Sequence, residues 1–187
     1  MLIIVRHGRT PANAQGLLLG RLDPDLDDIG EAQAAAVAAW IGPIDRLVSS
    51  PLLRCRRTAE AFGMDVEIDE RWIELDYGEL DGRRFDEVSA EVWTQLRTDP
   101  EFAPRGGESM AALARRVGTA CDELLADGAD ADIVVVTHVS PIKAALSWAL
   151  GGTNQVGWRT RVGQPSITRI ASGPHGPVLH AFNEAPR

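Results

Sequence analysis

Two histidines follow short apolar segments that lie far apart in the chain. His7 comes just after the run 2–5, and His138 comes just after the run 133–136. Runs of aliphatic and β-branched residues like these predict buried strands. A single histidine after a strand is more often a hydrogen-bonded structural residue than a catalyst. Two of them at the same edge of one sheet predict a shared functional site, because ligands bind at the carboxyl ends of parallel strands.

Two arginines are expected at that same edge. Arg6 directly precedes His7, and Arg54 lies in the first turn of a helix predicted over 52–62, after a short strand at 47–48. Guanidinium groups and helix N-termini both attract anions. Two histidines with two arginines therefore indicate a site for a compact anion such as phosphate.

Several other kinds of phosphate site have no sequence support. The chain contains no GxxxxGK[ST] loop and no GxGxxG after a strand, and it shows no HExxH, CxxC or clustered aspartates. We therefore expect neither a cofactor nor a catalytic metal. Without a metal, a neutral imidazole is a suitable nucleophile for phosphorus, forming a phosphohistidine. Arg6, Arg54 and His138 would stabilise the charge of the transferring group.

Strands and helices alternate along the chain, which predicts a mostly parallel sheet with helices on both faces. We expect an α/β three-layer sandwich that ends in a C-terminal hairpin, all within one domain spanning 1–187. The expected strands are 2–5, 47–48, 66–68, 133–136, 166–171 and 177–182. The expected helices are 28–40, 52–62, 89–97, 108–125 and 141–150.

Composition limits the possible function classes. The 187 residues are 44% apolar and 25% charged, as in soluble globular proteins, and disorder is excluded. A net charge of −8 argues against a general nucleic-acid binder and predicts a local basic cluster for any anion. The tract 133–150 is interrupted by His138 and Lys143, so no membrane span is expected. The chain starts without a secretory signal pattern, and we expect a cytoplasmic protein.

Five segments, in this order, resemble the histidine phosphatase (phosphoglycerate mutase-like) superfamily. They are LIIVRHGRT at 2–10 with Asn13, GRLD at 20–23 with Leu26 and Gly30, SSPLLRCRRTA at 49–59, GGES at 106–109, and VTH at 136–138. The pattern is most similar to short α-ribazole phosphatase-like and broad-specificity phosphatase-like members. The resemblance implies the same α/β fold and a metal-independent phosphomonoesterase.

The resemblance also implies roles for individual residues. His7 would be the nucleophile, and Arg6, Arg54 and His138 would complete the phosphate pocket. The further substrate contacts that it implies are Gly8, Thr10, Asn13, Arg21 and the backbone N–H of Val139. The expected partner is a small phosphorylated metabolite, with inorganic phosphate as a product and no nucleic acid or membrane involved. Association into homo-oligomers stays open.

A proton donor is needed for the leaving alkoxide, and later for the activation of water. The family places this residue in an L-x-E-x-x-x-G-x-x-x-G segment, which resembles 72–82 here and implies Glu74. On spacing alone, Asp76 and Glu79 are rivals in the same acidic loop.

Hydrolysis is favoured over transfer to a second position of the substrate. The segment 82–106 is short compared with cofactor-dependent mutases of the family, so water is expected to reach the phosphohistidine. A phosphoglycerate mutase and an inactive phospho-ligand binding module are the alternatives. The sequence leaves open whether Arg9, which stands where the family usually has glutamate, Arg159 or Arg161 contacts the substrate.

Overall fold

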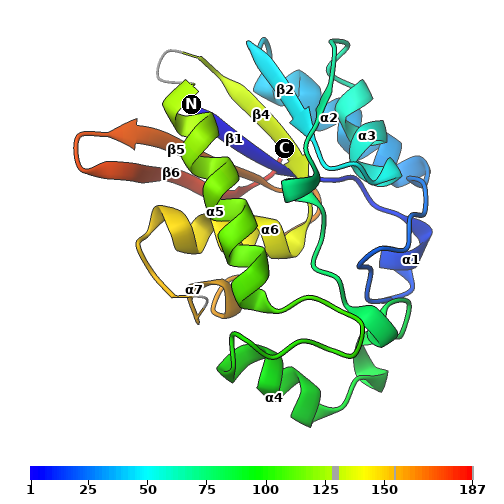
Figure 1. The fold of residues 1–187 in the computed structure, drawn as a ribbon. Helices are drawn as coiled ribbons and strands as arrows, with labels where there is room; N and C mark the ends of the chain where they lie inside the picture. Colours follow the sequence, from blue (N-terminus) through cyan, green and yellow to red (C-terminus); the bar gives the residue numbers. More distant parts are fainter. Residues whose placement is uncertain (128–130, 154, 187) are drawn as a thin grey trace.

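The computed structural model describes residues 1–127, 131–153 and 155–186, and these contain one six-stranded sheet in the order β3-β2-β4-β1-β5-β6 (Figure 1). The strands are β1 (Leu2–Arg6), β2 (Arg46–Ser49), β3 (Glu67–Ile68), β4 (Ile133–Thr137), β5 (Ile167–Gly173) and β6 (Gly176–Glu184). β1, β2, β3 and β4 are parallel, while β5 pairs antiparallel with both β1 and β6. The mostly parallel sheet and the C-terminal hairpin are confirmed.

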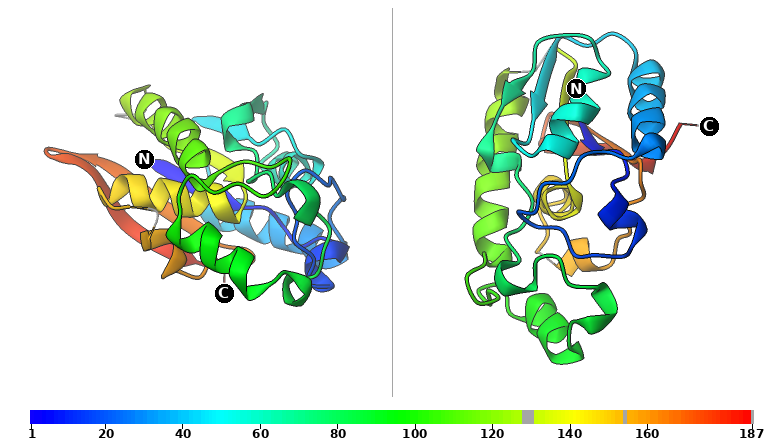
Figure 2. Two further views of the ribbon diagram at one scale, coloured as in Figure 1. Left: turned by 60° about the horizontal axis from the view of Figure 1, so that its bottom comes forward. Right: turned by 90° about the vertical axis from the view of Figure 1, so that its right-hand side faces the viewer.

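Helices cover both faces of the sheet (Figure 2). The helices are α1 (Pro11–Ala14), α2 (Asp28–Ile41), α3 (Leu53–Glu60), α4 (Ala90–Thr98), α5 (Met110–Asp127), α6 (Val139–Ala149) and α7 (Gln155–Trp158). Short 3₁₀ turns span Glu70–Trp72, Gly78–Leu80 and Phe85–Glu87. α5 and α6 pack on one face, and α2 and α3 pack on the other. The three-layer α/β architecture is therefore confirmed, with α4 set apart from the sheet at one end of the molecule.

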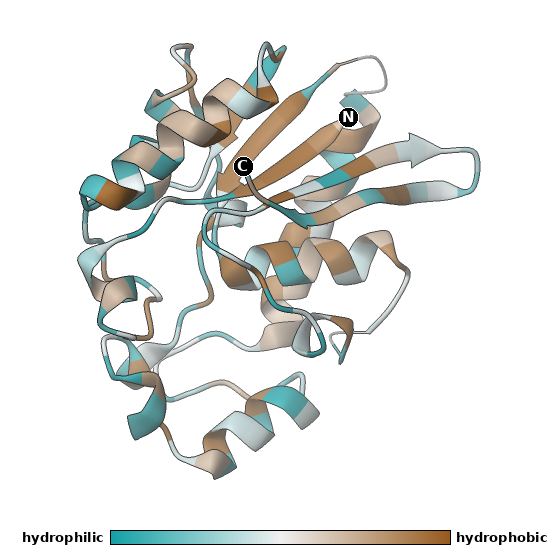
Figure 3. Ribbon diagram, turned by 180° about the vertical axis from the view of Figure 1, so that it is seen from behind, coloured by the Kyte–Doolittle hydropathy of each residue, from teal (hydrophilic) through white to brown (hydrophobic). Residues whose placement is uncertain are grey.

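The central strands are apolar on both faces because each face has its own core (Figure 3). Leu2 and Ile4 pack with buried residues of α5 and α6, whereas Ile3 and Val5 pack with α2 and α3. Side chains alternate between the two faces of a strand, so a strand that is covered twice needs a continuous apolar run. Full burial of each such side chain contributes about 1.5–3 kcal/mol to the free energy of folding. This burial stabilises the positions of β1 and β4, and with them the residues at their carboxyl ends.

Five elements, namely α1, α6, α7, β5 and β6, differ in presence or extent from the sequence-based expectation. α6 begins at Val139 and not near Pro141, because proline is tolerated in a first turn, where the backbone N–H groups have no intrahelical acceptor. The short helices α1 and α7 have too few residues to show an apolar period, and we did not predict them. The hairpin strands are longer than expected, leaving only Pro174 and His175 between them.

Gly8 and Gly30 lie where the chain after β1 crosses the start of α2. A Cβ on Gly8 would collide with the backbone oxygen of Gly30, and a Cβ on Gly30 would collide with that of Arg9. Backbone atoms cannot move aside as a flexible side chain does. The close approach of these two glycines therefore fixes the position of the segment that follows His7.

We expect Gly30→Ala to lower the free energy of unfolding by about 2–4 kcal/mol, because the added methyl group forces apart two packed backbones. Urea unfolding of both proteins measures the difference. Gly118→Ala is the matched control, since a Cβ there meets only Trp148 at an ordinary 3.7 Å. A Gly30→Ala protein as stable as the wild type would show that the crossing is not tight.

Candidate active site

The two histidines meet at the carboxyl ends of neighbouring strands. Arg6 of β1 pairs in register with Thr137 of β4, so the next residue of each strand lies at the same edge. The ring centroids of His7 and His138 are 5.1 Å apart, with an interplanar angle of 62°. Both rings are buried. The expected juxtaposition of the two histidines is confirmed.

His7 is held as a neutral imidazole with one free nitrogen. Its Nδ1 lies 2.7 Å from the carbonyl oxygen of Gly8, and because a carbonyl only accepts, Nδ1 carries the proton. Burial, with the positive charges of Arg54 and Arg6, lowers the pKa of His7 well below 6.5. The lone pair of Nε2 is therefore available for nucleophilic attack.

His138 is held by its neighbours through both ring nitrogens. Arg54 Nε donates to its Nδ1 at 3.3 Å, which leaves the proton of the neutral ring on Nε2. That nitrogen donates to Ser50 Oγ at 2.7 Å. Burial and the Arg54 charge lower the pKa of His138 well below 6.5, so it too is neutral. These two hydrogen bonds fix the orientation of the His138 ring beside His7.

Arg54 lies behind the histidine pair, with its side chain fully buried. It is the second residue of α3, and its Nη1 and Nη2 donate to the backbone oxygens of Leu22 at 2.7 Å and Gly20 at 3.1 Å. Neither Arg54 nor His138 lines the cavity described below. In this arrangement, the charge of Arg54 acts on His7 at close range, and its direct contact with phosphate stays a prediction.

Arg6 has a donor that no described residue satisfies. Its Nη1 donates to the backbone oxygens of Val162 and Gly163 at 3.0 and 3.1 Å, whereas its buried Nε has no hydrogen-bond partner within the described ranges. Burial lowers the pKa of Arg6 to about 10, which leaves it charged at neutral pH. An unpaired buried donor next to His7 is what a bound phosphoryl oxygen would satisfy.

The amide of Asn13 is oriented by three donors to its oxygen. Oδ1 accepts from the backbone N–H of Thr10 at 3.2 Å, from Thr10 Oγ1 at 3.0 Å and from Gln164 Nε2 at 3.0 Å. The NH₂ group of Asn13 is thereby directed to the cavity. Gln164 also donates to the backbone oxygens of His7 and Gly8 at 3.2 and 3.1 Å. Sequence reasoning missed Gln164, because no local spacing relates it to these residues.

Glu74 is a buried acidic residue that lines the same cavity as His7. It is 5% exposed, and its Oε1 accepts from the backbone N–H groups of Leu75 at 2.7 Å and Ser140 at 3.2 Å. Burial raises its pKa above the usual 4.5, so the carboxyl keeps its proton to a higher pH than an exposed glutamate does. Glu74 and His7 line the same cavity.

The two rival carboxylates face elsewhere. Asp76 accepts from the backbone N–H of Gly78 at 2.9 Å and pairs with Arg21 at 3.3 Å, and Glu79 is exposed. Asp76, Glu79 and Arg21 do not line the cavity that contains His7 and Glu74. The geometry therefore favours Glu74 as the proton donor, while a substrate contact by Arg21 gains no support from its position.

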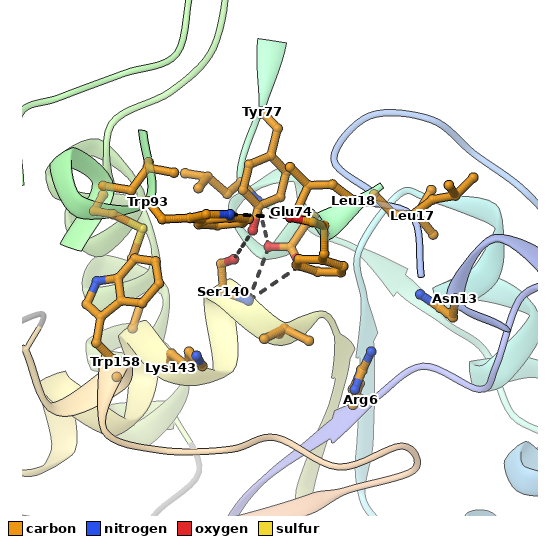
Figure 4. Close-up of a pocket in the computed structure, with 18 of the residues that line it drawn as sticks. Arg6, Asn13, Leu17, Leu18, Glu74, Tyr77, Trp93, Ser140, Lys143 and Trp158 are labelled. Carbon is orange, nitrogen blue, oxygen red and sulfur yellow. Dashed lines mark hydrogen bonds between the residues drawn. The ribbon is translucent and has the colours of Figure 1, made fainter. Parts of the chain in front are cut away.

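One cavity joins these groups (Figure 4). Its polar lining includes Arg6, His7, Asn13, Glu74, Ser140 and Lys143, with Val139 at the start of α6. Its apolar lining includes Leu17, Leu18, Phe85, Trp93, Met110 and Trp158. The polar groups come from the end of β1, from α1, from the loop that carries Glu74 and from α6, and most of the apolar groups come from loops and from α4 and α7. The arrangement is suited to an anion at the histidines with an apolar group beyond it.

The remaining candidates do not reach this cavity. Arg9 pairs with Asp27 at 2.8 Å, and Arg159 and Arg161 are exposed, outside the cavity lining. The described residues include no group of three or more histidine, cysteine, aspartate and glutamate side chains placed to hold a metal ion. None of the described helices is long and apolar enough to cross a membrane.

The sequence profile of the histidine phosphatase superfamily (branch 1) matches residues 2–185, so the chain belongs to this family. The chain is 35% identical over 186 residues to a glucosyl-3-phosphoglycerate phosphatase of Mycolicibacterium vanbaalenii, covering 84% of this chain and 81% of that protein. A crystal structure of phosphoserine phosphatase from Entamoeba histolytica in complex with 3-phosphoglyceric acid superimposes with a TM-score of 0.90 at 29% identity. That match covers 98% of this chain and 96% of the other.

A longer relative contains a similar region. The chain is 33% identical over 177 residues to a bifunctional protein of Mycobacterium tuberculosis, covering 89% of this chain but 49% of that protein. The chain thus spans about half the length of this relative.

Proposed function

We propose that the protein is a metal-independent phosphomonoesterase that hydrolyses a small phosphorylated metabolite through a phosphohistidine on His7. The observation that carries the proposal is the pairing of His7 and Glu74 in one cavity. His7 is neutral with Nε2 free, and burial favours the protonated form of Glu74. A nucleophile and an acid on one cavity are the two groups that ester cleavage requires.

The first half of the reaction transfers the phosphoryl group to the enzyme. Nε2 of His7 attacks phosphorus, a P–N bond forms, and the P–O bond to the alcohol breaks. Glu74 gives its proton to the leaving alkoxide, and the alcohol departs. Arg6 and the NH₂ group of Asn13 bind the phosphoryl oxygens, while the charge of Arg54 lies behind the ring.

The second half returns the enzyme to its starting state. The Glu74 carboxylate takes a proton from water, the hydroxide oxygen bonds to phosphorus, and the P–N bond breaks. Inorganic phosphate leaves, and both His7 and Glu74 recover their original protonation. Relatives that are named phosphatases support hydrolysis as the outcome.

The test is phosphate release from a panel of phosphomonoesters in the presence of EDTA. We expect turnover that does not depend on a metal. Isomerisation of 3-phosphoglycerate without phosphate release would instead establish a mutase. Folded protein that binds phosphate, catalyses neither reaction and forms no acid-labile phosphoprotein would be a binding module.

A further inference from the structure

The cavity contains a cation that the proposed reaction does not use. Lys143 is the only lysine of the sequence, and it lies on α6 one turn after Val139, partly buried and lining the same cavity as Arg6 and Glu74. Figure 4 shows it between Trp158 and Arg6. Its position places a positive charge to one side of the reacting groups.

The stem of Lys143 is held by α7. A Cβ on Gly157 would lie only 3.0 Å from the Cβ of Lys143, so the absence of a side chain at this position allows the close packing of α7 on α6. The ammonium group lies 5.4 Å from the ring centroid of Trp158, within the range of a cation–π contact. These contacts direct the lysine along the wall of the cavity.

No carboxylate of the described residues forms an ion pair with Lys143. Arg9, Arg21 and Arg116 each pair with a carboxylate, whereas no carboxylate of residues 1–127, 131–153 or 155–186 lies within ion-pair distance of Lys143. Lys143 is half-buried, and this burial lowers its pKa below the usual 10.5, although the Glu74 carboxylate in the same cavity acts in the opposite direction. A desolvated cation without a partner is stabilised by an anion that enters the cavity.

The space near this lysine has an apolar wall. Phe85 and Trp93 stack with ring centroids 5.8 Å apart and an interplanar angle of 14°, and Phe85 is 53% exposed. Both line the cavity together with Met110 and Trp158. A stacked aromatic pair that lines a cavity offers a flat surface to an apolar or ring-shaped part of a ligand.

We propose that Lys143 is a specificity-determining residue that binds a second negatively charged group, a carboxylate or a further phosphoryl group, on the alcohol part of the substrate. The body of that alcohol lies against the wall of Phe85, Trp93, Met110 and Trp158. The inference rests on the proposed phosphomonoesterase function and names the substrate class of that site: phosphate esters of an apolar alcohol that bears an acidic group.

The experiment compares kcat/KM for phenyl phosphate, the three carboxyphenyl phosphates and 1,4-phenylene bisphosphate. We expect the wild type to prefer at least one of the esters that carry a second acidic group over phenyl phosphate. Whether the carboxylated or the bisphosphorylated ester is preferred identifies that acidic group. Lys143→Met is expected to reduce this preference about 10-fold, mainly through KM, because a charged hydrogen bond is lost. Lys143→Arg keeps most of the preference, and Arg161→Met, which removes an exposed cation outside the cavity lining, keeps all of it.

Two results would overturn the inference. One is an unchanged preference in Lys143→Met. The other is an equal loss for all esters with a shifted pH profile, which would mean that Lys143 acts through the charge of Glu74. Circular dichroism confirms that each variant is folded.

A binding experiment tests the role of Lys143 separately from the proposed catalytic function. If the wild type hydrolyses no ester, calorimetry of carboxybenzylphosphonate and benzylphosphonate still tests the lysine. Tighter binding of the carboxylated compound to the wild type, lost in Lys143→Met, supports the inference, and equal binding contradicts it.

Discussion

Replacement of His7 by alanine is expected to reduce kcat by about 10⁴-fold or more, because the nucleophile is lost and neighbouring groups cannot replace it. His138 is the nearest imidazole, but its nitrogens face Arg54 and Ser50. Steady-state phosphate release from any ester that the wild type turns over measures the effect. Rapid acid-free quenching with a labelled substrate is expected to trap phosphate on the wild type and not on the variant.

His175→Ala is the matched control, because this histidine lies in the exposed turn between β5 and β6. It should keep wild-type turnover and labelling. Substantial activity in folded His7→Ala, or a label that survives in it, would place the covalent intermediate on another residue.

The second large effect is expected for Glu74→Gln, which lowers kcat by about 10²–10⁴-fold for alkyl phosphates. Glutamine preserves the shape of the side chain and an acceptor for the N–H groups of Leu75 and Ser140, but it cannot give a proton to the alkoxide. The first step of p-nitrophenyl phosphate cleavage is expected to suffer much less, since nitrophenolate leaves without protonation. Single-turnover kinetics with the two kinds of ester separates these effects.

The pH dependence of the cleavage step is an independent test of Glu74 as the proton donor. The cleavage step needs His7 neutral and Glu74 protonated. Burial and the arginine charges lower the pKa of His7, so the neutral ring persists well below pH 6.5. Burial raises the pKa of Glu74, so its proton persists above pH 4.5, and activity falls as pH rises through that raised value. Glu74→Gln is expected to lose this alkaline limb in single-turnover cleavage of an alkyl phosphate.

Glu79→Gln serves as the control for this variant, because Glu79 is exposed and does not line the cavity. It should retain the wild-type profile. If Glu74→Gln keeps the alkaline limb and the wild-type dependence on leaving group, the proton donor is a different residue.

The sequence alone determined the features that depend on local pattern. Continuous apolar runs at 2–5 and 133–136 predict strands covered on both faces, and strands alternating with helices predict a parallel sheet. These two inferences are sufficient to place His7 and His138 at the same edge of the sheet, because parallel strands run in the same direction and each histidine follows the carboxyl end of its strand. The structure confirms this with rings 5.1 Å apart.

Only the tertiary structure decided which side chains line one cavity with His7. Glu74, Asp76 and Glu79 lie close together in one acidic segment, but their surroundings differ. Glu74 is buried against α6, whereas Asp76 forms an ion pair and Glu79 is exposed. Gln164 orients Asn13 across 151 positions of the chain. Lys143 is packed against α7, and no carboxylate within the described ranges forms an ion pair with it. Burial and the distance between charges depend on segments remote in sequence, and these quantities set pKa and ligand preference.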